Sequence, residues 1–126
     1  MFHGSEDVIS TMARAMRFRV DRQAVLSANV ANADTPGYRR ADLVFGDALA
    51  KVDVARTHSQ HLAGEAGEEA GVRRVVERKA ARPDGNTVNL DRELIQLSRN
   101  AGAFSEQAEV LSRLLLLRQV AVAGGR

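Results

Sequence analysis

The sequence predicts an all-α fold in which two long terminal helices pair antiparallel as a coiled-coil-like unit. Three observations support this prediction. Apolar side chains recur every three or four residues near both ends of the chain, and the two periodic stretches are similar in length. Aromatic residues are scarce, with four Phe, one Tyr and no Trp among 126 residues, which suits long helices better than a sandwich or barrel. The segment between the helices is expected to be extended or partly disordered, with room for a short β-hairpin.

The first helix is expected from about Ser5 to Ala33. Its apolar residues follow a three-four spacing, which places them on one face that packs against a partner. The residues predicted to face that partner are Met12, Met16, Leu26 and Val30. The helix has to end near Ala33, because Pro36 and Gly37 favour a tight turn and Thr35, which precedes a proline, is disfavoured in helical backbone.

The second helix is expected from Asn89 to Ala123, with Asn89 as its N-cap and the following Gly124-Gly125 as its end. Its three-four alternation persists over successive heptads, which is typical of a coiled-coil seam. The residues predicted to form this seam with the first helix are Leu94, Leu97, Phe104, Leu111 and Leu115. At 1.5 Å per residue the second helix is roughly 50 Å long and the first about 43 Å, so the two can pair.

Toward its end the second helix carries further apolar side chains that lie off this seam. One partner helix cannot cover them, and several exposed leucines cost several kcal/mol at about 25 cal/mol per Å² of apolar surface. We expect this surface to be buried against other subunits, and the alternative is cover by the central segment of the same chain. The residues predicted to lie between subunits are Leu114, Leu117 and Val120.

The centre of the chain is heterogeneous. A short extended or helical piece is favoured by Leu43, Phe45 and Leu49. Residues 64–71 alternate Gly and Ala with Glu, as a flexible acidic loop does, and residues 72–79 have the Val-rich pattern of a strand. The two terminal helices are expected to form one domain, and the segments of the chain are expected to be residues 1–38, 39–83 and 84–126.

A chemical function is the weakest interpretation of this sequence. The chain has no Cys, which excludes disulfides and thiolate metal sites, and no Ser stands in the setting of a catalytic nucleophile. His58 and His61 are three residues apart, but zinc needs further ligands and this segment is not expected to be helical. We therefore predict no catalytic residues, no cofactor and no bound metal.

Charge and hydropathy also restrict the partners. The net charge is +2, and bases and acids are interleaved, so the chain lacks the single-sign stripe that tracks a phosphate backbone. The first residues are acidic where a signal peptide carries bases, and no long apolar segment follows them. We expect no cleaved signal peptide, no nucleic-acid partner and no direct insertion into a membrane.

The stretch from Leu26 to Tyr38 reads Leu-Ser-Ala-Asn-Val-Ala-Asn-Ala-Asp-Thr-Pro-Gly-Tyr. It resembles the N-terminal signature of the bacterial flagellar rod and hook family, in which a Leu-Ser-Ala-Asn-Ile-Ala-Asn run precedes a Thr-Pro-Gly-Tyr turn. Val30 replaces the usual isoleucine. Within that family the chain is most similar to the short proximal rod proteins, because it carries Asp-Gly-Asn-Thr-Val at residues 84–88, before its last helix.

The resemblance implies a structural subunit of the proximal rod in the flagellar basal body. Such a subunit transmits torque, assembles through its terminal helices, and reaches the periplasm-spanning rod through the flagellar type III export channel without a cleaved signal peptide. The partners that the resemblance implies are other rod subunits, a FliE-like basal adaptor protein and the export gate. The turn after the first helix is then expected to present contacts to the next subunit through Asn29, Asn32, Thr35, Pro36, Gly37 and Tyr38.

Two further interpretations stay open at this point. Phe45 and Leu49 resemble the Phe-x-x-x-apolar export-gate motif of rod and hook subunits, but the same spacing also suits two residues that pack against the helices. The chain itself could be another short proximal rod protein, or a cytoplasmic coiled-coil adaptor that dimerises through its second helix. An adaptor explains the heptads but gives no use for the Asn-rich helix end and the Thr-Pro-Gly-Tyr turn.

Overall fold

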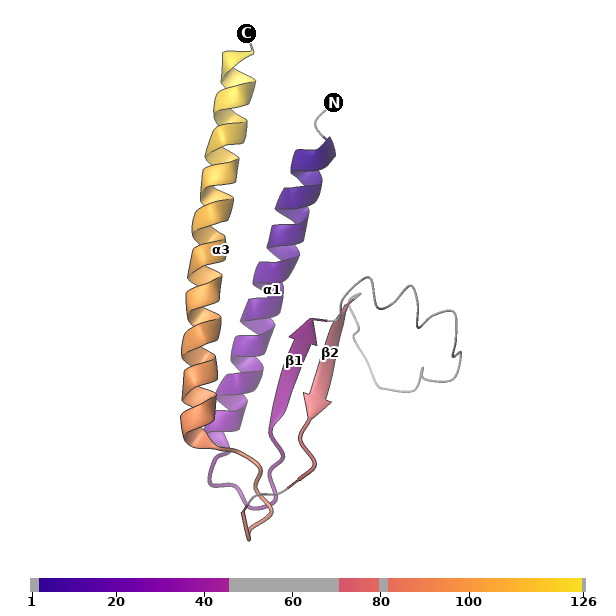
Figure 1. Cartoon of the computed structure of the whole chain (residues 1–126), viewed down its shortest axis with the longest axis vertical. Coiled ribbons are helices and arrows are strands. Elements are labelled where there is room, and N and C mark those ends of the chain that lie inside the picture. The colour runs from indigo at the N-terminus through magenta and orange to yellow at the C-terminus, as the bar shows by residue number, and fades with distance from the viewer. Residues whose placement is uncertain (1–2, 46–70, 80–81, 126) are drawn as a thin grey trace, which may run out of the picture.

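The computed structural model describes residues 3–45, 71–79 and 82–125. Two long helices, α1 (His3–Ala31) and α3 (Leu90–Gly124), pack against each other, and a two-stranded sheet lies beside them. Figure 1 shows that the helices are antiparallel, with both ends of the chain at the same end of the pair. The predicted all-α unit with a short hairpin in its central segment is therefore confirmed.

The end of α1 follows the expected turn chemistry. The helix ends at Ala31, two residues before the expected Ala33, and the chain continues in tighter turns. In these turns the N–H of Ala33 donates to the carbonyl of Val30 at 3.2 Å, and the N–H of Tyr38 donates to that of Thr35, also at 3.2 Å. Gly37 has a φ of 72°, as a turn of the predicted kind requires.

The start of α3 is capped as predicted. The side chain of Asn89 accepts a 3.1 Å hydrogen bond from the N–H of Arg92, and the backbone of Asn89 is extended, as it is in an N-cap. At the other end the helix runs to Gly124 and is followed by Gly125. Neither α1 nor α3 has a stretch apolar and long enough to cross a membrane, within the residues that the structure describes.

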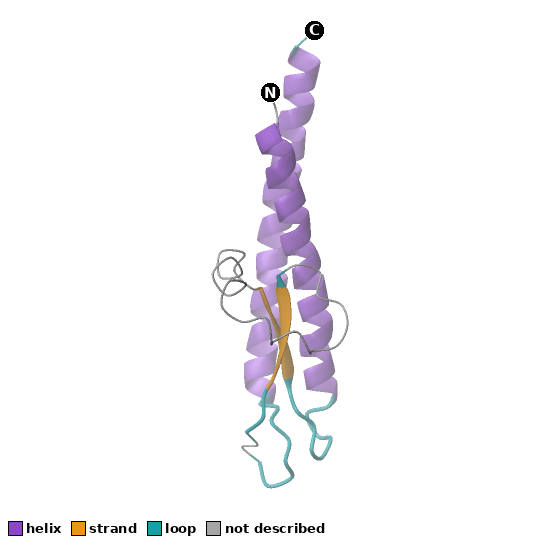
Figure 2. Cartoon of the chain, turned by 90° about the vertical axis from the view of Figure 1, so that its right-hand side faces the viewer, coloured by secondary structure: helices purple, strands orange, loops and turns teal. Residues whose placement is uncertain are grey.

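The two strands, β1 (Ala41–Phe45) and β2 (Val72–Val76), pair antiparallel, with Ala41 opposite Val76 and Phe45 opposite Val72. β1 packs against α1, and Figure 2 shows the strands running alongside the helix pair. The ring of Phe45 meets that of Phe18 edge to face, with 5.1 Å between the ring centroids. Leu49, expected in the same short piece of chain, lies outside the described residues.

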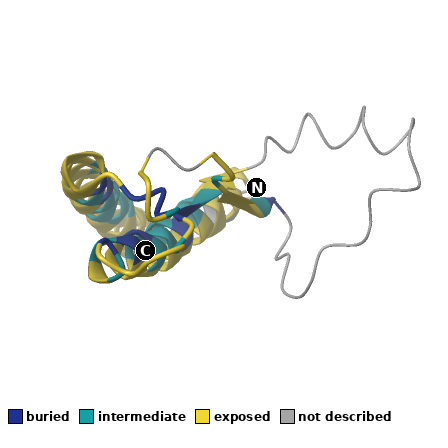
Figure 3. Ribbon diagram, turned by 90° about the horizontal axis from the view of Figure 1, so that it is seen from below, coloured by how far each residue is buried: buried dark blue, intermediate teal, exposed yellow. Residues whose placement is uncertain are grey.

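The interior is small and unusually polar. The buried apolar residues are Phe18, Leu26, Ala33, Ala41 and Val88. A larger set of polar residues is buried with them, namely Asn29, Arg40, Asn86, Thr87, Glu93 and Asn100. These residues gather where the helices meet the first strand and its connections (Figure 3). The fold is therefore held at one end of the helix pair by side chains whose burial requires hydrogen bonds.

One column of the predicted seam on α3 faces α1, and the other is replaced by the column one position earlier in the sequence. Leu97, Phe104 and Leu111 are partly buried, but Leu94 and Leu115 are 49% and 47% exposed. The second column of the observed interface consists of Glu93, Asn100, Gln107 and Leu114, spaced seven apart. The helix has this orientation because Glu93 and Asn100 make buried hydrogen bonds to α1. On α1, Leu26 is fully buried and Met12, Met16 and Val30 are partly buried.

Candidate functional site

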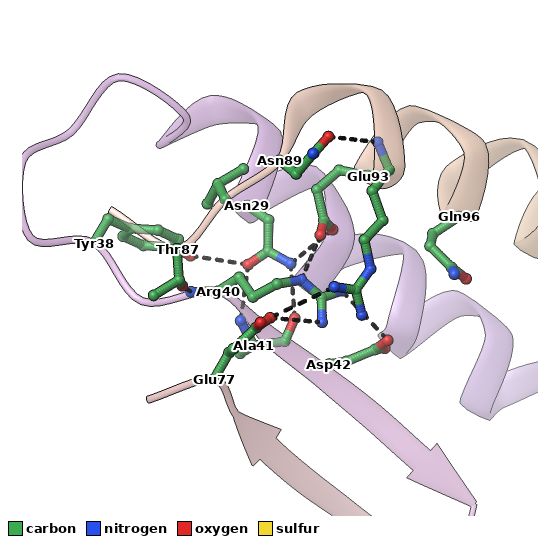
Figure 4. A network of polar contacts seen from close by, with 12 residues as sticks. Asn29, Tyr38, Arg40, Ala41, Asp42, Glu77, Thr87, Asn89, Glu93 and Gln96 are labelled. Carbon is green, nitrogen blue, oxygen red and sulfur yellow. Dashed lines mark hydrogen bonds and ion pairs between the residues drawn. The ribbon is translucent and has the colours of Figure 1, made fainter. Parts of the chain in front are cut away.

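A cluster of polar side chains joins α1, β1 and the first turns of α3. We call it the polar joint; its members are Arg22, Asn29, Arg40, Asp42, Glu93 and Gln96. All of them except Arg22 are labelled in Figure 4. All of them are buried or partly buried, and every one is hydrogen-bonded to another member.

Asn29 lies at the centre of the polar joint and is fully buried. Its side-chain amide donates to the carbonyl of Ala41 at 2.7 Å and accepts from the N–H of the same residue at 3.0 Å. It thereby pairs with the main chain of β1 as a neighbouring strand would, because an amide presents a donor and an acceptor together. The side-chain oxygen of Asn29 also accepts a hydrogen bond from the hydroxyl of Tyr38 at 3.3 Å.

Glu93 brings α3 into the joint. It is 0% exposed, and its carboxylate accepts from Asn29 at 3.0 Å and forms an ion pair with the guanidinium of Arg40. Arg40 is itself 6% exposed, and its backbone N–H donates to the hydroxyl of Thr87 at 2.7 Å. A buried carboxylate is tolerated only when it is paired and hydrogen-bonded, so Glu93 requires both partners at once.

Arg22 and Asp42 form the outer part of the joint. The guanidinium binds the carboxylate in a bidentate fashion, at 2.8 and 3.0 Å, and also donates to Gln96 on α3 at 3.2 Å. The hydrogen bond to Asp42 raises the pKa of Arg22 despite burial. Burial alone would raise the pKa of Asp42, but the bonds from Arg22 and the N–H of Leu43 and the charge of Arg40 outweigh it, so the pKa of Asp42 is lowered.

A second set of contacts lies where α1 ends. The side-chain nitrogen of Asn86 lies 3.0 Å from the carbonyls of Asn32 and Ala33 and 2.8 Å from that of Thr35. These carbonyls lie in the turns that follow the last residue of α1, Ala31, so Asn86 binds the exit of the helix from a distant part of the chain. The N–H of Gly37 donates to the carbonyl of Asp84 at 2.9 Å.

The two sequence motifs that suggested a family are therefore bound to each other. The Asp-Gly-Asn-Thr-Val stretch at residues 84–88 packs on the Asn-rich helix end and the Thr-Pro-Gly-Tyr turn, and the N–H of Thr87 donates to the carbonyl of Tyr38 at 3.0 Å. Each motif places a glycine with positive φ at this contact, 72° at Gly37 and 79° at Gly85. A Cβ at Gly85 would stand 3.5 Å from the Cα of Gly37, so the turns touch glycine to glycine.

The structure distributes the residues expected between subunits over two kinds of environment. Asn29 is fully buried inside its own chain, and Asn32 and Tyr38 are partly buried and hydrogen-bonded within it. The residues of the same group that are exposed are Thr35, Pro36 and Gly37. On α3, Leu114 is partly buried, and Leu117 and Val120 are 65% and 61% exposed.

The last turns of α3 present the largest run of exposed apolar side chains among the described residues. We call residues 116–124, the last residues of α3, the overhang. Figure 1 shows that the end of α3 continues past the start of α1. Its large apolar residues are 60–67% exposed and are Leu116, Leu117, Val120 and Val122.

Several residues of the polar joint were not predicted from the sequence. Arg22 and Glu93 belong to no apolar periodicity and to neither sequence motif, so neither was singled out from the sequence. One signal was present: Glu93, Asn100 and Gln107 recur at seven-residue spacing beside the leucine seam. Polar residues repeated at one heptad position indicate a helix pair whose register is specified by buried hydrogen bonds.

The polar joint can hold elements together, and its side chains offer little for chemistry. The acids in it are paired with guanidinium groups, and no cluster of three or more His, Asp or Glu suited to a metal ion occurs within residues 3–45, 71–79 and 82–125. His58 and His61 lie outside those residues.

Comparison with known proteins gives a consistent result. The family model described as "Flagella basal body rod protein" matches residues 9–39. The chain is 36% identical to the flagellar basal body rod protein FlgB of Salmonella typhimurium, over 80% of this chain and 82% of the relative. It is 34% identical to that of Escherichia coli, over 78% and 80%, and 31% identical to that of Cereibacter sphaeroides, over 96% and 98%.

Proposed function

The chain belongs to the FlgB family of flagellar basal body rod proteins, and from this membership we propose how it works as a subunit of the proximal rod. The family is structural rather than enzymatic. Membership also decides between the interpretations left open above, against another short proximal rod protein such as FlgC and against a cytoplasmic coiled-coil adaptor.

We propose that the polar joint makes the helix pair a stiff unit that can pass torque to its neighbours. Torque is transmitted only if the angle and register of the helices stay fixed under load. Buried hydrogen bonds and ion pairs fix both, because sliding α3 by one residue would take the buried carboxylate of Glu93 away from Asn29 and Arg40.

We further propose that the subunit assembles with other rod proteins and with a FliE-like adaptor through apolar surface on α3. Leu117 and Val120 support this, since they are more than half exposed and the other described residues leave them uncovered. Side chains of this size are costly in water, and contact with another subunit removes that cost. The exposed turn at Thr35, Pro36 and Gly37 is the second proposed contact.

Export through the flagellar type III gate would precede folding in this proposal. The ring of Phe45, one half of the possible export motif, packs against Phe18 in the folded chain. Phe45 is 45% exposed in the folded chain, so this contact covers only part of the ring, and a gate that binds the whole ring would act on the unfolded chain.

The observation that carries the proposal is a contrast between two parts of the chain. The side chains of the polar joint are hydrogen-bonded to one another, whereas the apolar side chains at the end of α3 are exposed to solvent. Leu117→Glu combined with Val120→Glu tests it in a strain that lacks the chromosomal copy. We expect the double variant to be made and to fold, but to be missing from purified basal bodies and to leave the cells non-motile.

Ser98→Glu is the matched control, because Ser98 is exposed on the same helix but lies outside the apolar run. It should restore motility. Normal basal bodies that contain the double variant would contradict the proposed role of this surface.

A further inference from the structure

A groove of about 560 Å³ opens between α1 and α3. Small side chains line much of it, among them Ala24 on α1 and Ala101 and Ser105 on α3, and Phe104 contributes an apolar wall. Small residues on two neighbouring helices leave room for the backbone of a third helix to approach closely.

The groove also contains an acceptor without a partner. Asn100 lines it and is 1% exposed. Its side-chain nitrogen donates to the carbonyl of Arg19 and to the side-chain oxygen of Gln23, both at 2.8 Å, which fixes the orientation of the amide. The side-chain oxygen of Asn100 is then buried with no hydrogen-bond partner among the described residues. A buried acceptor of this kind is costly, and a donor brought by a docking partner would remove the cost.

The overhang of a second copy has the shape and chemistry to fill this groove. Leu116, Val120 and Ala123 follow one another at helical spacing and so share one face, and Gln119 lies beside them with an amide that can donate. All four are exposed. The face thus offers apolar groups for Phe104 and a donor for Asn100.

Charge complementarity sets the direction of docking. The C-terminal end of a helix carries a partial negative charge, and α3 has no basic residue in its last turn to offset it. Arg19 contributes a positive charge to the groove. A neighbouring α3 would therefore lie with its end toward Arg19.

We propose that the groove between α1 and α3 receives the overhang of a second copy of this chain, with Gln119 of that copy donating to the side-chain oxygen of Asn100. This inference rests on the proposed function as a rod subunit. The groove and the overhang are different surfaces and lie at different positions along the helix axis, so the contact is heterologous and builds an open array. Val120 lies about 17 residues beyond the middle of the groove wall on α3, which displaces successive copies by roughly 25 Å along the helix axis.

Disulfide cross-linking tests the contact, and the natural chain contributes no background because it contains no Cys. Ala101→Cys and Val120→Cys are made as separate full-length variants and oxidised alone and as a mixture. The mixture should give several times more cross-linked dimer than either variant alone. Val120→Cys mixed with Val75→Cys, an exposed position on β2, is the control and should give no such increase.

Two results would overturn the inference: no increase in the mixture, or a dimer that forms as efficiently from Ala101→Cys alone. Gln119→Met probes the hydrogen bond, because it keeps an unbranched side chain but removes the donor. It should lower the yield several-fold without a change in helix content by circular dichroism, and an unchanged yield would exclude Gln119 as the donor.

The same cysteines separate this inference from the proposed function. In cells that make a chain with both substitutions, basal bodies that contain the chain but lack the cross-link overturn the docking contact alone. Basal bodies that lack even the natural chain overturn its role as a rod subunit.

Discussion

Asn29 on α1 donates a 3.0 Å hydrogen bond to Glu93 on α3, across 64 residues of sequence, and neither residue is exposed to solvent. Each residue also has a second partner. Asn29 is hydrogen-bonded to the main chain of Ala41, and Glu93 forms an ion pair with the guanidinium of Arg40. One amide and one carboxylate therefore tie both helices to the first strand. Removing Asn29 takes the side-chain partners from the main chain of Ala41, and removing Glu93 takes one acceptor each from Asn29 and Arg40.

Asn29→Ala should destabilise the fold strongly. It leaves the main chain of Ala41 without its side-chain partner and removes one hydrogen bond from the buried carboxylate of Glu93. Unsatisfied buried groups of this kind cost about 1–3 kcal/mol each, so we expect the free energy of unfolding to fall by about 2–4 kcal/mol in urea titrations. Asn32→Ala is the control, because Asn32 makes its local bond to Ala28 in an exposed setting and should cost less than about 1 kcal/mol. Equal losses would show that the joint contributes nothing special.

Acid should weaken the outer part of the joint. The pKa of Asp42 is lower in the folded chain than its ordinary value of about 3.9, so the folded state favours the charged carboxylate. The stabilisation is complete above that ordinary value and is lost as the pH falls through the lowered pKa. Arg22 stays charged throughout, since its pKa is raised.

The prediction for Asp42 is measured as the free energy of unfolding from about pH 6 to about pH 3. The natural chain should lose stability more steeply below about pH 4 than Asp42→Asn does. Asp21→Asn is the matched control, because Asp21 is an exposed aspartate on α1. This substitution should leave the slope of stability against pH unchanged. Parallel curves for Asp42→Asn and the natural chain would contradict the role assigned to the Arg22 pair.

Helix bounds and caps were predictable because their signals are local. Asn89 caps α3 and Gly37 adopts a positive φ, as the sequence alone indicated. Local rules decide such features, since an N-cap or a tight turn depends on a few neighbouring residues. The pairing of the helices was predicted from their apolar periodicity together with their similar lengths.

The face of α3 turned toward α1 could not be found from apolar periodicity. Leu94 and Leu97 belong to adjacent columns of the same helix, and only Leu97 is turned inward. The decision rests on Glu93 and Asn100, whose partners Asn29 and Arg19 are distant in the sequence. Ranking residues by hydrophobicity excludes such positions, although a buried polar residue with satisfied partners can fix the register of a helix pair.

Alanine substitutions at two glycines, one in the contact between the turns and one in α3, are expected to change the stability of the chain in opposite directions. Gly85→Ala should destabilise the chain by about 1–2 kcal/mol, because an L-residue at a φ of 79° is strained even though its Cβ would have room. Gly102→Ala should stabilise it by up to about 1 kcal/mol, because Gly102 is in the interior of α3 and nothing lies near its added methyl group. Thermal unfolding of the two variants measures both. A Gly85→Ala variant as stable as the natural chain would contradict the assignment of Gly85 to a position that requires glycine.

Hydrogen exchange in the free subunit should divide α3 into two parts. Amides near Glu93 and Asn100 lie in the turns fixed by buried bonds to α1 and should exchange slowly. Amides beyond about Arg118 should exchange far faster, because the end of α3 continues past the start of α1 and a few turns of helix are marginal alone. The contrast should shrink once subunits assemble and the overhang is covered. Slow exchange throughout α3 at low protein concentration would show that the overhang is stable without a neighbour and would remove the energetic reason for its assembly.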